Sequence, residues 1–199
     1  MQPSTIKIID SFTTSLWSGG STTQLAIHPD SSQYQNRDFI WRLSSATVED
    51  EHSSFTCLPH YNRIISVITG DIRLVHPDCE IQVLPGVIHS FDGGESTECF
   101  GVCTDFNLMM KKGVCCGSVD FAKLSPSVSF SSHCDSAKSA QFENCFCAIY
   151  PIDGDVDLWV LGQNVLCPKG SLGLIEGPAT DISLTSRGSV GAFVCFIYC

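Results

Sequence analysis

The chain has 199 residues, of which 43% are hydrophobic, and a formal net charge of −10. This apolar content is enough for one large core or two small ones, whereas the acidic excess repels nucleic acids and anionic lipids. Met1–Asp10 carries one Lys and no apolar segment, and no later segment approaches the roughly 18 apolar residues that span a bilayer. We therefore expect a cytoplasmic protein that binds neither nucleic acid nor membrane.

The twelve cysteines are predicted to be free thiols, because nothing in the sequence resembles a secretory signal. Most should pack as small buried hydrophobic residues. No two of them have the CxxC spacing that structural zinc sites and redox motifs usually show. The cysteines therefore predict no metal site.

Short segments rich in β-branched and aromatic residues predict strands at residues 72–75, 80–84, 155–160 and 193–197. The apolar segment 190–199 is typical of a buried terminal strand. Residues 125–140 are rich in serine and partly loop-like, although the alternation of Val128 and Phe130 leaves a strand open. Many short strands without long helical stripes indicate an all-β sandwich or barrel.

An internal repeat organises these strands. Three glycines recur with their spacing unchanged 84 residues later: Gly70, Gly86 and Gly93 as Gly154, Gly170 and Gly177. Gly70-Asp71 would lie in a hairpin turn, where glycine accepts a positive φ. Two such units predict a cupin-type double β-barrel, or bicupin, with halves at residues 1–113 and 114–199.

Four segments of the first half carry a resemblance to a known family. They are LWSGGSTTQL at 16–25, FIWRLSSATV at 39–48, SFTCLPHYNR at 54–63 and DFNLM at 105–109. In this order they resemble the motifs W-x-GG-x-T-[EQ], WR-[IL]-S-x-A-x-V, F-x-x-LPG-x-x-R and DFNLM of the HutD/Ves family. His60 departs from the pattern, because the family usually has Gly there. The resemblance covers residues 15 to 113, just over half of the chain.

The resemblance implies a bicupin. HutD proteins are associated with histidine utilisation in bacteria as accessory or regulatory proteins, and Ves relatives with cold or stress responses. Neither branch has a firmly assigned reaction. The family therefore predicts a fold and a cellular context but no chemistry.

Metal-dependent cupins resemble one another in two motifs, and they bind a divalent ion through two His and a Glu of the first motif and a further His of the second. Arg63 stands where the Glu ligand belongs, and only His89 of the imidazole ligands is present. We therefore expect no metal and no cofactor, and a place for His89 in the core or at a pocket rim. His76 should lie in a solvated turn.

An arginine in place of an acidic ligand favours anions over cations inside the barrel. The predicted ligand is a small organic acid such as urocanate or formimidoylglutamate. The residues expected around it are Arg63, Thr22, Thr23, Gln24, Arg42, Ser44, His89 and Asn107. In the alternative interpretation, Arg63 and Arg42 form buried ion pairs with Asp105 or Glu49.

Three functions remain open at this point. The first is a non-enzymatic protein that binds a small carboxylate, with no catalytic residue assigned. The second is a metal-independent isomerase or hydrolase acting on a small polar metabolite, with Asp105 or His89 as acid and base. The third is a protein-interaction module, which includes a homodimer formed through a β face.

Overall fold

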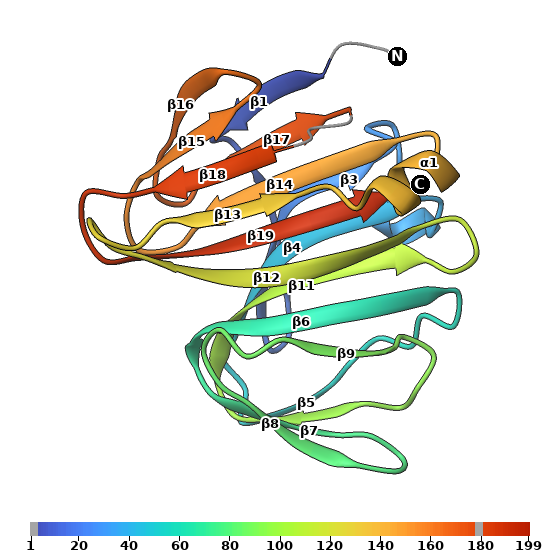
Figure 1. The fold of residues 1–199 in the computed structure, drawn as a ribbon. Helices are drawn as coiled ribbons and strands as arrows, with labels where there is room; N and C mark the ends of the chain where they lie inside the picture. Colours follow the sequence, from blue (N-terminus) through green and yellow to red (C-terminus); the bar gives the residue numbers. More distant parts are fainter. Residues whose placement is uncertain (1–3, 178–180) are drawn as a thin grey trace. The chain divides into compact units, whose positions relative to one another are not determined.

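The computed structural model describes residues 4–177 and 181–199, and they form an all-β protein divided into two compact units (Figure 1). The first unit is Phe12–Cys115. The second unit combines Cys116–Cys199 with the chain up to Ser11. None of the helices in the described residues is long and apolar enough to cross a membrane.

The first unit contains two sheets. The large sheet has the order β2-β3-β4-β11-β6-β9, and the small sheet has the order β5-β10-β7-β8. The elements are β2 (Thr13–Trp17), β3 (Gly20–His28), the 3-10 turn η1 (Tyr34–Asn36), β4 (Trp41–Val48), β5 (His52–Ser54), β6 (Tyr61–Gly70), β7 (Ile72–Val75), β8 (Glu80–Val83), β9 (His89–Asp92), β10 (Glu98–Phe100) and β11 (Cys103–Lys111).

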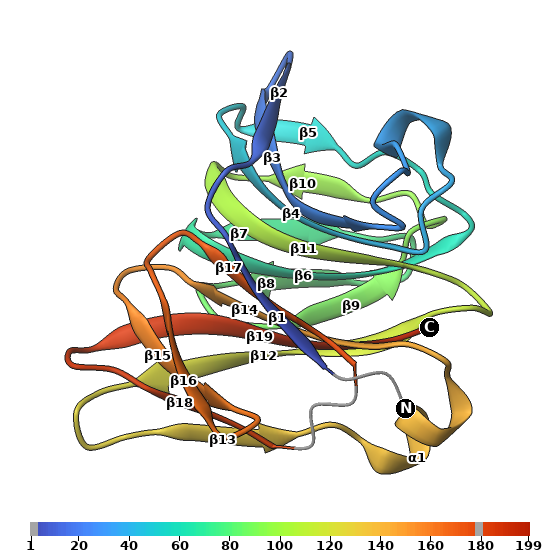
Figure 2. The same cartoon turned by 90° about the horizontal axis from the view of Figure 1, so that it is seen from above.

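The second unit has the same two-sheet plan. Its large sheet has the order β1-β17-β14-β19-β12, so that the N-terminal strand lies beside β17 (Figure 2). Its small sheet has the order β13-β18-β15-β16. The elements are β1 (Thr5–Ile9), β12 (Cys116–Leu124), β13 (Phe130–His133), α1 (Ser136–Gln141), β14 (Cys145–Pro151), β15 (Val156–Val160), β16 (Gln163–Cys167), β17 (Leu172–Glu176), β18 (Asp181–Thr185) and β19 (Val190–Tyr198).

Two packed sheets, rather than a closed barrel, enclose the core of each unit. In the first unit, Ile65 and Val67 of the large sheet share a buried cluster with Ile72 and Leu74 of the small sheet. Among the described residues, no ladder joins these two sheets, and only the Val67–Pro85 bridge links them. The predicted all-β fold is confirmed, but the expected barrel closure is absent because the strands form two separate sheets.

The chain changes sheet at Gly70. This residue ends β6 in the large sheet with φ +81°, and β7 begins two residues later in the small sheet. A Cβ at Gly70 would lie 2.4 Å from the carbonyl oxygen of Val102, so a side chain does not fit. The expected hairpin turn at Gly70-Asp71 is therefore a corner between two sheets.

The predicted strands are otherwise confirmed. The segment expected as a buried terminal strand is β19, whose residues are all buried and which lies between β14 and β12 in the large sheet of the second unit. The serine-rich segment contains the short strand β13 and the helix α1. Eight of the twelve cysteines are buried, as expected for small apolar residues.

Candidate functional site

A cavity of about 380 Å³ lies on the inner face of the large sheet of the first unit. Its lining comes from β2, η1, β3, β4, β6, β11 and the segment that begins in β5. The lining residues are Ser15, Leu16, Trp17, Thr22, Tyr34, Gln35, Arg42, Ser44, Ala46, Val48, Ser53, Ser54, Phe55, Thr56, Arg63, Asp105, Asn107 and Met109. We refer to it below as the Arg63 pocket.

Strand register brings the polar side chains of the Arg63 pocket together. Met109 of β11 pairs with Arg42 of β4 on one side and with Arg63 of β6 on the other. Asn107, two residues earlier, pairs with Ser44. Because alternate residues of a strand face the same side of a sheet, these side chains share one face.

The side chain of Arg42 is fixed by two hydrogen bonds and by a contact with an aromatic ring. Its Nε donates to Gln24 Oε1 at 3.0 Å, and its Nη1 donates to Ser44 Oγ at 3.1 Å. The guanidinium lies 4.5 Å from the centre of the Tyr34 ring. Burial lowers the pKa of Arg42, yet an arginine keeps its proton at neutral pH. Arg42 is thus a fixed positive charge at the wall of the pocket.

Arg63 is also buried, with 5% of its surface exposed, but it is far less well paired. Its guanidinium lies 4.6 Å from the ring centre of Phe55 and 5.1 Å from that of Phe91. The Nε atom has no hydrogen-bond partner among the described residues. Burial lowers the pKa of Arg63 to about 10, partly offset by the charge of Asp105. The side chain therefore remains a cation at neutral pH.

The ion pairs of the alternative interpretation are not formed. Within the described part of the chain, no ion pair joins Arg42 or Arg63 to Asp105 or Glu49, and Glu49 is exposed. The two guanidinium groups instead contact aromatic rings and neutral polar groups. Their hydrogen-bonding capacity is therefore not used by a protein carboxylate.

Asp105 adds a titratable group to the pocket. A register shift between Thr104 and Asp105 interrupts the pairing of β11 with β6 at this point. The Ala46 N–H donates to Asp105 Oδ1 at 2.9 Å. Burial raises the pKa of Asp105 to about 6, against the opposing effects of the Ala46 hydrogen bond and the charges of Arg63 and Arg42. Near neutral pH, this carboxyl group is close to its titration range.

The structure brings most of the predicted residues together. Thr22, Arg42, Ser44, Arg63 and Asn107 line the pocket, and Gln24 contacts it through Arg42. The Oδ1 atom of Asn107 is buried and has no hydrogen-bond partner in the described residues. It is available to a donor group of a ligand.

Two predicted residues lie elsewhere. Thr23 is absent from the pocket lining, and its hydroxyl lies 2.8 Å from that of Thr14 in an exposed position. Its neighbour Thr22 faces the pocket, as strand alternation requires. His89 is also absent from the lining, and its Nε2 lies 3.0 Å from Nε2 of His76. These two residues are removed from the candidate site.

His76 differs from expectation. It is 6% exposed rather than solvated, and its Nδ1 lies 3.1 Å from Thr97 Oγ1. The contact between the two imidazoles requires that one Nε2 carry a hydrogen and the other accept it. Burial, followed by the charge of His76, lowers the pKa of His89. Among the described residues, no three His, Cys, Asp or Glu side chains are placed to hold a metal ion.

Sequence reasoning missed the aromatic part of the pocket. Tyr34 lies in the 3-10 turn between β3 and β4, and Trp17 ends β2. Trp17 belongs to the first family-like segment, but its neighbours there gave no indication of which way it faces. Nothing in the local pattern around Tyr34 marks it as a pocket residue, because its contact with Arg42 joins a turn to a strand.

The HutD family model matches residues 10–161. Among solved structures, the chain is similar to a conserved protein of unknown function from Pseudomonas aeruginosa PAO1. The two are 21% identical with a TM-score of 0.76, and 98% of each chain is covered. The chain is also similar to HutD from Pseudomonas fluorescens SBW25, in a structure described as its formate condition. That comparison gives 21% identity and a TM-score of 0.66, covering 98% of this chain and 97% of the other.

More distant structures show the same fold. A Cupin 2 conserved barrel domain protein from Leptotrichia buccalis is 8% identical, with a TM-score of 0.56, and the match covers 93% of this chain and 91% of the other. At this level of identity the likeness shows a cupin-like fold alone. A search of curated proteins found no match.

Proposed function

The chain belongs to the HutD family and has a cupin-like fold, and we propose that its Arg63 pocket binds the carboxylate of a small organic acid without converting it. Occupancy of the pocket would then report the level of a metabolite. The family association leads us to propose a cytoplasmic accessory role in histidine utilisation, with urocanate or formimidoylglutamate as ligand candidates.

The observation that carries this proposal is the state of Arg63. Its guanidinium is buried beside a cavity, and among the described residues its Nε has no hydrogen-bond partner and no carboxylate forms an ion pair with it. A buried charge without a partner is costly. A ligand carboxylate could accept two parallel hydrogen bonds from the guanidinium and so remove that cost.

The dimensions and composition of the pocket support the same ligand class. A cavity of about 380 Å³ falls in the range of small-molecule sites, which combine apolar walls with a few placed polar groups. Tyr34, Phe55 and Met109 supply the walls, and Asn107 can orient a second polar group of the ligand. The solved structure of HutD from Pseudomonas fluorescens in its formate condition makes formate a suitable minimal probe.

We also propose that the two units derive from one repeated half. The order of strands from β6 to β10 recurs from β14 to β18, and β7 and β15 begin at Ile72 and Val156, 84 residues apart. Superposition of the main-chain segments β6–β10 and β14–β18 tests this. Dissimilar paths of the two segments would refute the common origin.

The test of binding is calorimetric titration of metal-stripped protein with formate, glutamate, formimidoylglutamate and urocanate. We expect saturable binding of at least one acid, with no product detectable by NMR after prolonged incubation. Arg63→Leu should weaken binding by about 30-fold to 1,000-fold, which corresponds to about 2–4 kcal/mol. Unchanged affinity in folded R63L protein would remove Arg63 from the site.

Arg73 offers a matched control. It belongs to the same unit, is 40% exposed, and pairs with Glu80 at 2.9 Å on the small sheet. Arg73→Leu removes the same charge from outside the pocket and should leave affinity unchanged. An equal loss in both variants would indicate a general effect of net charge rather than a contact at the pocket.

A second candidate function rests on Asp105. A carboxyl group with a pKa of about 6 inside a pocket is suited to general acid–base catalysis at neutral pH. In this case one of the acids would be consumed during the NMR incubation, and Asp105→Asn would stop the reaction while leaving binding intact. Turnover with these properties would replace the binding-only proposal.

A further inference from the structure

Two buried cysteines of the second unit face each other. Cys134 follows β13, and Cys145 begins β14, eleven positions later in the chain. Their sulfur atoms lie 2.9 Å apart, so no other atom stands between them. Both side chains are buried, with 8% and 6% of their surface exposed. A disulfide forms only where two cysteines approach with their side chains directed at each other.

The surroundings of Cys134 favour its thiolate. Either of the two thiols can donate the hydrogen bond between them. When Cys134 is the thiolate, Cys145 donates to it, and this bond lowers the pKa of Cys134 to about 7 and raises that of Cys145. The Tyr198 hydroxyl lies beside them, where it accepts a hydrogen bond from the Asp135 N–H at 2.8 Å. Cys134 is therefore the thiol of this pair that ionises more readily.

Other buried cysteines lack this activation. Cys147 and Cys195 of the same unit are fully buried, and burial raises the pKa of both thiols. In the first unit, burial raises the pKa of Cys99 to about 11 and that of Cys103 to about 12. A thiol that stays protonated is a poor nucleophile. Burial alone therefore does not make a cysteine of this chain reactive.

We propose that Cys134 and Cys145 are a redox modification site, at which a hydroperoxide converts the two thiols into an intramolecular disulfide. Cys134 is the residue attacked first, and Cys145 resolves the product. The proposal concerns the second unit alone and does not depend on ligand binding at Arg63.

The chemistry balances with the hydroperoxide as oxidant. The Cys134 thiolate attacks one peroxide oxygen, the O–O bond breaks, and the other oxygen leaves as alkoxide or hydroxide and takes up a proton. Cys145, losing its proton, then attacks the sulfur of the resulting sulfenic acid. An S–S bond forms, the S–O bond breaks, and water leaves. Two thiols and one hydroperoxide thus give a disulfide, one water and one alcohol or second water.

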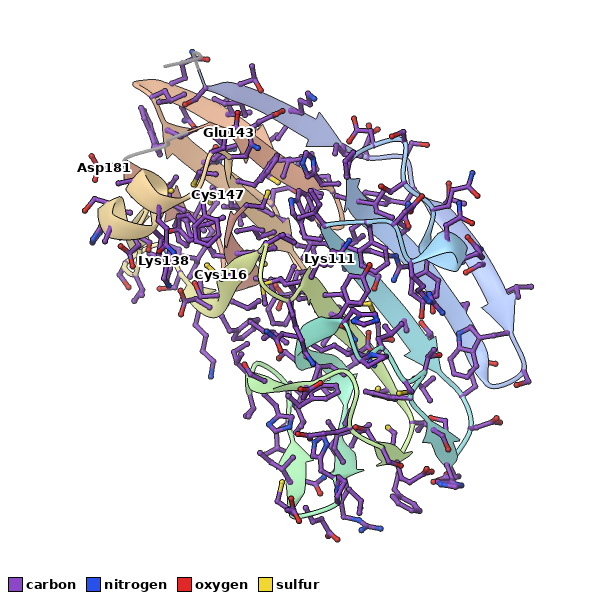
Figure 3. The ribbon with its side chains drawn as sticks, turned by 90° about the vertical axis from the view of Figure 1, so that its right-hand side faces the viewer. Lys111, Cys116, Lys138, Glu143, Cys147 and Asp181 are labelled. Carbon is purple, nitrogen blue, oxygen red and sulfur yellow. The ribbon has the colours of Figure 1, made fainter. Side chains whose placement is uncertain are left out.

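The covering segment explains why the oxidant should be small. The chain between the two cysteines contains α1, in which no residue is buried. Figure 3 shows this end of the unit, with Lys138 in α1 and Cys147 on β14, two residues beyond Cys145. A segment with so few buried residues opens locally at a low free-energy cost. Such an opening admits a small peroxide, whereas a protein oxidant would have to bring its whole active site to the two cysteines.

The test is treatment of the full chain with a small excess of hydrogen peroxide, followed by peptide mapping without reduction. We expect a Cys134–Cys145 cross-linked peptide, lighter by two hydrogen atoms and restored by dithiothreitol. Its rate of formation should rise with pH across the neutral range, following the ionisation of Cys134. Cys145→Ser should accumulate a sulfenic acid at Cys134 that a dimedone-type reagent traps.

Cys79→Ser is the matched control, because Cys79 is an exposed thiol of the first unit. This variant should form the disulfide at the unaltered rate. The proposal is overturned if peroxide first oxidises other cysteines while Cys134 remains reduced. It is also overturned if the unsubstituted protein stops at a sulfenic acid on Cys134. Both readouts come from the native chain, so they do not depend on the folding of a variant.

Discussion

The large sheets of the two units have the same kind of architecture but different inner faces. In the first unit, β6 and β11 present Arg63, Asp105 and Asn107 to a cavity. In the second unit, β19 lies between β14 and β12 with all nine residues buried and none charged, and Phe196 and Val194 pack in a continuous apolar cluster. The fold therefore provides two similar large sheets, and the side chains on their inner faces decide which sheet can bind a ligand.

The largest expected change in the free energy of unfolding tests whether the inner face of the large sheet of the second unit is a filled core. Phe196→Ala should lower the free energy of unfolding by about 3–5 kcal/mol, because it removes a buried ring and leaves a cavity. Urea denaturation measures the change. Trp159→Ala is the control, since Trp159 is 49% exposed and its removal should cost less than about 1 kcal/mol. Equal losses of unfolding free energy in the two variants would show that Phe196 is no more part of a packed core than Trp159.

Replacing Arg63 on the inner face of the large sheet of the first unit should not lower the free energy of unfolding. Arg63→Met replaces a buried cation, which forms no ion pair among the described residues, by an apolar side chain of similar length. The free energy of unfolding should stay unchanged or rise by about 1–4 kcal/mol, while binding of the organic acid is lost. Urea denaturation and calorimetry of one preparation provide both values. Severe destabilisation would show that Arg63 serves the core rather than the pocket.

Asp105 should make ligand binding depend on pH. A bound carboxylate repels ionised Asp105 and so raises the pKa of Asp105 further above its value of about 6 in the free protein. Binding then takes up a proton, and formate affinity should rise up to about tenfold as the pH falls from about 7.5 to about 5.5. Calorimetry in buffers with different ionisation enthalpies measures this uptake.

Asp105→Asn keeps an oxygen that can accept the Ala46 hydrogen bond but cannot titrate. Its formate affinity should no longer change over that pH range. A pH dependence that persists in this variant would assign the effect to another group. Loss of all binding would instead show that the carboxyl group of Asp105 is itself required.

The smallest expected effect concerns the His76–His89 pair outside the pocket. The pKa of His89 is lowered from its ordinary value of 6.5 by burial, and secondarily by His76, with Glu95 opposing. A histidine whose pKa is lower in the folded state contributes stability above pH 6.5, and that contribution is lost as the pH falls through the lowered value.

Since His89 is half-buried, solvent screening should keep its contribution below about 1 kcal/mol. Urea denaturation at pH 7.5 and pH 5.5 measures it, and His89→Gln should reduce the difference between the two values. A His89→Gln protein with an unchanged pH dependence would contradict this assignment.

The sequence predicted the parts of the candidate site that depend on strand alternation. Arg42 and Ser44 lie two residues apart in one segment, so they face the same side as soon as that segment is a strand. Alternation also separates Thr22, which lines the pocket, from Thr23, which does not. Which of the two faces inward could not be predicted, because the register of β3 against β4 is set by their pairing and contains a shift after Gln24.

The all-β fold class, the main strands and the buried thiols were determined by the sequence itself, because β-branched and apolar patterns act over a few neighbouring residues. The tertiary structure alone decided contacts between distant segments. It placed β1 beside β17, turned the chain at Gly70 into a second sheet, buried His76 against His89, and set Tyr34 over Arg42. Among the described residues, it also left Arg63 without an ion pair to a carboxylate and brought Cys134 against Cys145. These features depend on which strands pair and in which register, and the alternation within one strand does not encode that choice.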